Sequence, residues 1–79
     1  MVIYLKAGGE LRRRLCPDVD EYTRRVEVPE GKTLAEILTG IGIDPGLVAF
    51  AVKAGELRRL DYVPSDGDVL TLQPPVSGG

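Results

Sequence analysis

The sequence has 79 residues, of which 43% are hydrophobic and 28% are charged, a composition typical of one small folded domain. A chain of this length buries only about 60% of the surface that its unfolded form exposes, so it has little room for a deep substrate cavity and an ordinary catalytic role is disfavoured. It contains no His, no Trp and one Cys, which excludes catalysis by His, zinc sites built from Cys and His, and a disulfide framework.

The charge balance also limits the classes of binding partner that the chain is expected to have. Ten basic and twelve acidic residues give a formal net charge of −2, which argues against nucleic-acid binding and favours a protein partner. No apolar run approaches the ~18 residues that span a bilayer, and the chain opens without a basic leader. With its single Cys, the chain is expected to be cytoplasmic and to have no membrane contact.

The first predicted element is a strand over residues 2–6, with Ile3 and Leu5 facing the core. Leu11 and Leu15 then fit both a helix and a strand. We predict a short helical turn there, because Glu, Leu and Arg favour helix and Pro17 ends the segment.

A second strand is predicted over residues 22–28, with Val26 and Val28 inward. The clearest helix signal follows, because Thr33 and Glu36 have the spacing of a capping box, in which each side chain accepts a hydrogen bond from the backbone amide of the other residue. This helix should last about two turns and end near Gly40. Its apolar face is formed by Leu34, Ile37, Leu38 and Ile41.

The second half of the chain predicts three more strands. Residues 47–53 should place Val48, Phe50 and Val52 on one face, with Ala49 and Ala51 on the other, lightly covered face. A tight turn leads to a short edge strand over residues 56–60, and a turn at 64–67 precedes a last strand over 68–73. The predicted fold class is therefore α+β, with one main helix packed across a mixed sheet of four to five strands.

Other polar features have plain structural interpretations. Asp66, Gly67 and Asp68 resemble a metal loop only superficially, and we expect a tight turn. Cys16 lies in no motif and is expected to be a small buried or half-buried hydrophobe. Three pairs or triplets of Arg, at 12–14, 24–25 and 58–59, fit either a docking patch for an acidic partner or charge that keeps a small domain soluble.

The sequence ends in Pro74-Pro75-Val76-Ser77-Gly78-Gly79. Consecutive prolines favour an extended conformation, so these six residues should project roughly 20 Å from the domain. Residues 1–73 are therefore expected to form the domain and residues 74–79 a flexible tail. Gly78 and Gly79 have no side chains, so they could pass a narrow channel and bring the Gly79 carboxylate to another protein's active site.

This tail, the opening strand, the capped helix and the turn at Asp66 together resemble the ubiquitin-like β-grasp sulfur carriers of the MoaD/ThiS family. The Pro-Pro-Val-Ser-Gly-Gly ending looks most like the small subunit of molybdopterin synthase. The resemblance implies a β-grasp fold and a carrier, not an enzyme. A ubiquitin-activating-like enzyme would adenylate the Gly79 carboxylate with ATP, and sulfur would convert it to a thiocarboxylate. The chain itself would bind no cofactor and no metal.

The resemblance further implies two partners, the adenylating enzyme and a sulfur-accepting enzyme such as the molybdopterin synthase large subunit. In β-grasp folds the first and last strands are neighbours, so outward side chains of both would share one docking face. The expected docking residues are Tyr4, Val69, Thr71, Gln73, Pro74, Pro75 and Val76. Gln73 departs from the family pattern, which often has an aromatic or aliphatic residue before Pro-Pro.

Other functions stay open at this point. A ubiquitin-like modifier joined to lysines through Gly79 would use the same adenylate, and sulfur delivery to thiamine or to tRNA thiolation would use the same tail. An interaction module with an inert tail is a further alternative. A ferredoxin-type electron carrier is excluded, because one Cys cannot hold an iron–sulfur cluster.

Overall fold

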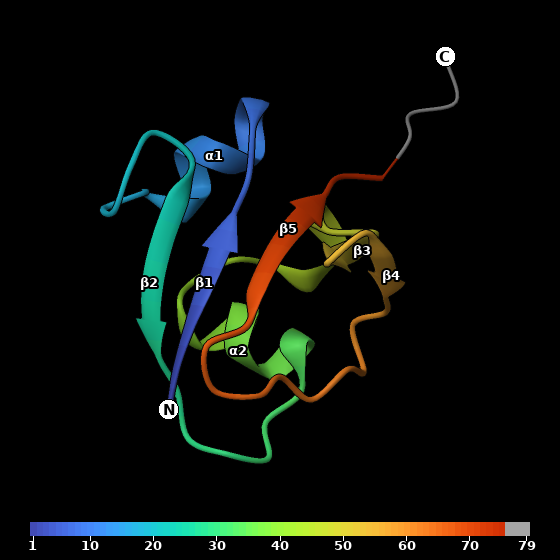
Figure 1. Ribbon diagram of the computed structural model, residues 1–79. Helices are drawn as coiled ribbons and strands as arrows, with labels where there is room; N and C mark the ends of the chain where they lie inside the picture. The colour runs from blue at the N-terminus through green and yellow to red at the C-terminus, as the bar shows by residue number, and fades with distance from the viewer. Residues whose placement is uncertain (76–79) are drawn as a thin grey trace.

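The structure is a computed structural model that describes residues 1–75. One five-stranded sheet carries the fold, with its strands in the spatial order β2-β1-β5-β3-β4 (Figure 1). The predicted α+β class, with one main helix across a mixed sheet, is confirmed. In chain order the elements are β1 (Val2–Lys6), α1 (Gly9–Leu15), β2 (Thr23–Glu27), α2 (Leu34–Gly40), the 3-10 turn η1 (Pro45–Leu47), β3 (Phe50–Lys53), β4 (Glu56–Arg58) and β5 (Val69–Gln73).

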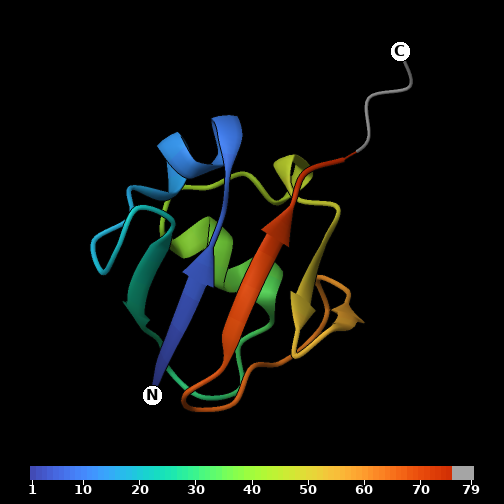
Figure 2. The same cartoon turned by 45° about the horizontal axis from the view of Figure 1, so that its top comes forward.

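The first and last strands lie side by side at the centre of the sheet. β1 and β5 run parallel, with Tyr4 opposite Val69 and Lys6 opposite Thr71, while β1–β2, β3–β4 and β3–β5 are antiparallel pairs. Because β1 and β5 run in the same direction, their C-terminal ends lie at the same end of the sheet, next to α1 and η1 (Figure 2). The chain therefore leaves β5 beside these two short elements.

Helix α2 covers one face of the sheet, behind β1 and β5 in the view of Figure 1. The capping box predicted from the sequence is present: the Glu36 amide donates to Thr33 Oγ1 at 3.2 Å, and the Thr33 amide donates to Glu36 Oε1 at 3.0 Å. The hydrogen bond from the Thr33 backbone amide lowers the pKa of the Glu36 carboxyl. Gly42 has φ of 86°, a left-handed conformation that only glycine adopts without strain, and it ends this segment.

The core lies between α2, α1 and the sheet. The predicted inward residues of the strands over 2–6 and 22–28 and of the Thr33 helix are buried there, apart from Ile41, which is half-buried. Helix α1 confirms the helical prediction for this segment, because Leu11 and Leu15 sit one turn apart and both point into the core. The largest fully buried side chains are Ile3, Leu5, Leu15, Leu34, Leu38, Ile43, Leu70 and Leu72.

The predicted facing of the segment before the Ala54 turn is wrong. Ala51 is 0% exposed and belongs to the core, whereas Phe50 and Val52 are half-buried on the other face of the sheet. The register explains this, because β3 places Ala51 opposite the buried Leu72 of β5. Alternation within one strand separates two faces but does not say which face is covered.

The strand expected over 47–53 is also shorter than predicted. Leu47 belongs to η1, where the Asp44 carboxylate accepts a hydrogen bond from the Gly46 amide. Val48 follows this turn and is buried outside β3. Its burial therefore comes from the 3-10 turn and not from strand alternation.

The segment Asp66–Asp68 is a tight turn, as expected, and its carboxylates bind backbone. Asp66 Oδ1 accepts from the Val2 amide at 2.7 Å, and Gly67, with φ of 86°, donates its amide to the Val2 carbonyl. Asp68 Oδ2 accepts from the Ser65 amide at 2.9 Å. Within residues 1–75, no group of three or more His, Cys, Asp or Glu side chains is placed to hold a metal ion.

Cys16 differs from the expectation. It is exposed, because it caps the C-terminus of α1 with φ of 55° and the preceding Leu15 takes the buried position. The Arg groups do not form one patch either. Arg24 donates to the Leu15 carbonyl on the β2 side of the sheet, whereas Arg58 stacks over Tyr62 on β4 at the opposite edge.

Candidate functional site

The root of the tail is fixed to the sheet. The Ala49 amide donates to the Gln73 carbonyl at 2.8 Å, one step beyond the last paired residue of β3. Pro74 and Pro75 follow and are exposed. Since proline has no amide hydrogen, the ladder of strand hydrogen bonds ends here. The expectations for Val76, Gly78 and Gly79 fall outside the described residues.

A small cavity of about 150 Å³ lies beside this root, between α1 and η1. Leu11 and Leu47 form its apolar wall, Glu10 and Arg14 its charged rim, and the two prolines its remaining side. The chain therefore leaves the domain beside α1 and η1, whose side chains lie next to Pro74 and Pro75. The lining residues are Glu10, Leu11, Arg14, Leu47, Pro74 and Pro75.

The four predicted docking residues of the sheet come together on the face that α2 does not cover, which we call the open face. Tyr4 is opposite Val69, and Thr71 and Gln73 continue along β5 on the same side, because the residues between them, Leu70 and Leu72, are buried. Val69 is 44% exposed and the other three are half-buried. The placement agrees with the expected common face, and the docking role of these residues stays a prediction.

Sequence reasoning missed three members of the open face. Phe50 is opposite Gln73, Val52 is opposite Thr71, and Leu57 of β4 is opposite Val52. Leu57 is 54% exposed. With these additions the open face is an apolar surface that crosses β1, β5, β3 and β4. The sequence predicts no partner for β3, and its pairing with β5 is the signal that would have found them, since that pairing puts Ala51 inward and its neighbours outward.

The apolar part of the open face has a charged border on the side of β2. Lys6 and Arg25 are exposed and share the face with Tyr4, and Glu27 pairs with Arg25 at 3.3 Å. Three charges of this kind are solvated, so they contribute little to stability. They leave a surface with an apolar centre and a mostly basic border.

A partly buried polar cluster around Asp68 holds the start of β5 in place. Lys53 Nζ lies 2.9 Å from Asp68 Oδ1 and 3.0 Å from Tyr62 Oη, and Tyr62 donates to Asp68 Oδ2 at 2.7 Å. Burial alone would raise the pKa of Asp68, but the hydrogen bonds from Ser65, Tyr62 and Lys53 outweigh it and lower the pKa. The hydrogen bonds from Lys53 to Tyr62 and Asp68 raise the pKa of Lys53.

This cluster ties Lys53, at the end of β3, and Tyr62, in the loop before β5, to Asp68, the residue that directly precedes β5. It thereby fixes the strand whose other end carries the tail.

The described residues 1–75 include no helix long and apolar enough to cross a membrane.

A single helix across a five-stranded mixed sheet with parallel central strands is the β-grasp architecture of ubiquitin-like proteins. Its likeness to a solved structure is specific: the crystal structure of SAMP1 from Haloferax volcanii has 26% sequence identity over 100% of both chains, with a TM-score of 0.67. The chain matches the ThiS family over residues 13–79 and belongs to that family. No curated protein matches it. The fold and the family place the chain among ubiquitin-like sulfur carriers and modifiers.

Proposed function

We propose that this protein is a sulfur carrier whose reactive group is the carboxylate of Gly79. In the first step a carboxylate oxygen attacks the α-phosphorus of ATP on a partner enzyme, and pyrophosphate leaves. In the second step hydrosulfide attacks the acyl carbon of the adenylate, AMP leaves, and loss of the sulfur-bound proton gives a thiocarboxylate. The chain would be the substrate of both steps and would need no catalytic residue or bound cofactor of its own.

The observation that carries the proposal is the position of the open face relative to the tail root. Gln73 and Phe50 form the end of the open face, and Pro74 leaves β5 directly beyond them. A partner that covers the open face would therefore also lie next to the point at which the tail leaves β5. Membership of the ThiS family over residues 13–79, a range that includes Pro74 to Gly79, supports the same assignment.

The molybdenum or tungsten cofactor pathway is the destination that we favour. The support is the Pro-Pro-Val-Ser-Gly-Gly ending, which resembles that of the molybdopterin synthase small subunit. The sulfur acceptor would then be the large subunit of that synthase. Co-purification of a thiamine-pathway or tRNA-thiolating enzyme with the thiocarboxylated chain, in place of the synthase subunit, would assign the sulfur to that route instead.

Intact-mass spectrometry tests the carrier chemistry. The full chain is incubated with an adenylating enzyme, ATP and sulfide, and we expect one carboxylate oxygen to be replaced by sulfur. A chain lacking Gly78 and Gly79 is the matched control and should keep its original mass. Higher-mass conjugates with lysine-containing proteins would show a modifier and contradict the carrier proposal. Full cognate activity in the truncated chain would show that the tail is inert.

A further inference from the structure

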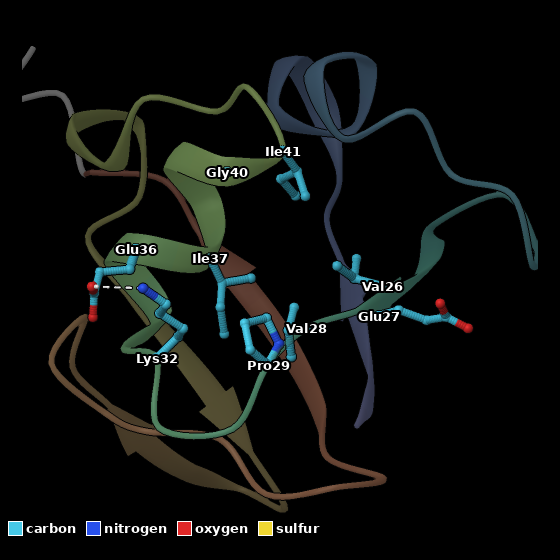
Figure 3. A pocket seen from close by; sticks show the side chains of 9 residues that line it. All are labelled: Val26, Glu27, Val28, Pro29, Lys32, Glu36, Ile37, Gly40 and Ile41. Carbon is cyan, nitrogen blue, oxygen red and sulfur yellow. Dashed lines mark ion pairs between the residues drawn. The ribbon is translucent and has the colours of Figure 1, made fainter.

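A groove lies on the side of the molecule away from the open face, between α2 and β2 (Figure 3). Its volume is about 360 Å³. Ile37 and Ile41 of the α2 segment face Val26 and Val28 across it, with Pro29 at one end, whereas the Glu27 carboxylate points away. Among the described residues that line its helix side, the charged ones are Lys32 and Glu36, which form an ion pair at 3.8 Å. The groove therefore offers an apolar floor without a net charge.

The strand beside this groove is an edge strand. β2 has β1 on one side and no strand on the other within residues 1–75. Met1 and Val28 exchange both backbone hydrogen bonds, so the next pair, Val2 and Glu27, is a non-hydrogen-bonded pair. The amide and carbonyl of Glu27 consequently point outward, as do those of Arg25 and Thr23.

The protein covers only part of this edge. Asp18 Oδ1 accepts from the Arg25 amide at 3.0 Å, and the amides of Asp18 and Val19 both donate to the Thr23 carbonyl. Among residues 1–75, no group pairs with the Arg25 carbonyl or with either backbone group of Glu27. One donor and two acceptors are thus left beside the groove, whereas the rest of the edge is protected, as exposed edges usually are.

We propose that the groove binds an extended segment of another protein, which adds to the sheet as a sixth strand beside Glu27. Three unpaired backbone groups in strand geometry match a peptide backbone, and they match neither a helix nor a small apolar molecule. Residues of the segment opposite Val26 and Val28 point into the groove and are apolar. The segment residues opposite Glu27 and Arg25 lie over the other face of the sheet.

The charges of Glu27 and Arg25 determine which residue types of the bound segment are favoured opposite them. In the antiparallel direction the four residues facing Val28, Glu27, Val26 and Arg25 follow one another along the bound chain. A basic residue facing Glu27 and an acidic residue facing Arg25 complement the existing pair. The recognised sequence is therefore apolar, basic, apolar, acidic.

A second copy of this chain fits the site less well. An antiparallel pair of β2 strands would place Arg25 opposite Glu27 of the other copy, which is favourable, but it would also drive Pro29 of one copy toward the loop that covers Thr23 in the other. The edge that remains is long enough for an incoming peptide that ends at Arg25. This binding is independent of the tail and of the proposed carrier chemistry, because the groove is on the helix side of the sheet.

The experiment uses the full chain labelled with ¹⁵N and a capped peptide whose centre reads isoleucine-lysine-isoleucine-glutamate. Amide chemical shifts are followed during titration. We expect saturable shifts confined to residues of β2 and α2, and no such shifts with a peptide in which serine replaces both isoleucines.

Two pairs of variants separate the backbone and groove contributions. Glu27→Pro removes the outward amide without breaking a backbone hydrogen bond of the domain, and Glu27→Ala retains that amide; both variants lose the ion pair with Arg25 equally. We expect the proline variant to bind the peptide about fivefold more weakly than the alanine variant, the effect of one hydrogen bond. Gly40→Leu fills the groove from open space, since a Cβ at Gly40 meets nothing within 4 Å, and it should abolish binding. Thr39→Leu, on the exposed part of the same helix, should not.

Three results would overturn the proposal. The first is equal binding by the Glu27→Pro and Glu27→Ala variants. The second is a set of shifts centred on Tyr4, Val69 and Thr71, which would locate peptide binding on the open face. The third is a dimer in sedimentation equilibrium that Glu27→Pro dissociates, because the edge would then serve a second copy. Loss of sulfur transfer has no bearing on any of these readouts.

Discussion

Asp68 shows how a single carboxylate can look like a ligand in sequence and be a structural group in space. It stands in an Asp-Gly-Asp segment, yet its oxygens accept from Tyr62, Lys53 and the Ser65 amide. Because the side chain is almost fully buried, an unpaired charge there would be costly. The residue therefore stabilises the join between β3 and β5 that positions the tail.

Asp68→Asn should lower the free energy of unfolding at neutral pH by ~2 kcal/mol, since it removes charge-assisted hydrogen bonds but keeps the shape. The pKa of folded Asp68 lies below its ordinary value of 3.8, so its contribution is fully present above that pH and is lost as the pH falls through the lower folded value. Urea unfolding of the variant should consequently depend less on pH in this acid range. An unchanged pH dependence would contradict the assignment.

At the scale of elements, β3 is the strand whose role depends most on its neighbours. Its own residues alternate between small and large, and this pattern suggested that the large ones are buried. Pairing with β5 reverses that expectation, because Ala51 faces Leu72 beneath the helix and Phe50 faces outward with Gln73. The small side chain in the core and the large ones on the surface give the open face its apolar centre.

Phenylalanine substitutions at the two alanines test this facing. Ala51→Phe forces a large ring into a filled core and should lower the free energy of unfolding by about 1–3 kcal/mol. Ala49→Phe adds the same ring at an exposed position and should change stability little. Thermal and urea unfolding of both variants gives the comparison. Equally small effects at both positions would restore the facing expected from the sequence, which put both alanines on the lightly covered face.

At the scale of the whole molecule, the open face and the tail root form one continuous surface. The apolar residues cross four strands, and the last strand delivers Pro74 and Pro75 from the same edge. The α2–β2 groove lies on the other side of the sheet, and the proposed segment reaches the open face only at its border, at Arg25 and Glu27. The fold thus separates a surface next to the tail from a second surface remote from it.

A charge introduced on the open face should weaken docking of the activating enzyme. Leu57→Glu places a carboxylate on this surface, and we expect the KM for the chain in the adenylation reaction to rise about tenfold with kcat unchanged. Val19→Glu is the matched control, because Val19 and Leu57 are both 54% exposed but Val19 lies in the loop before β2. Equal KM values for the two variants would remove Leu57 from the docking surface, and circular dichroism checks that both remain folded.

Local chemistry determined much of this protein from sequence alone. The capping box at Thr33, the alternation of Ile3 with Leu5, and the turn at Asp66 depend on residues close in the chain, so their structures followed from propensity and spacing. The Pro-Pro step and the terminal glycines likewise directed attention to the carboxylate of Gly79.

Only the tertiary structure decided which side of each strand is covered and which edge stays open. Ala51 is inward because β5 lies beside β3, Cys16 is exposed because α1 ends in a left-handed residue, and the edge of β2 is open at Glu27 because Asp18 reaches only as far as Arg25. These outcomes depend on contacts between residues far apart in the sequence. Strand alternation has a period of two whatever lies next to the strand, so the covering layer, and not the pattern, assigns each face.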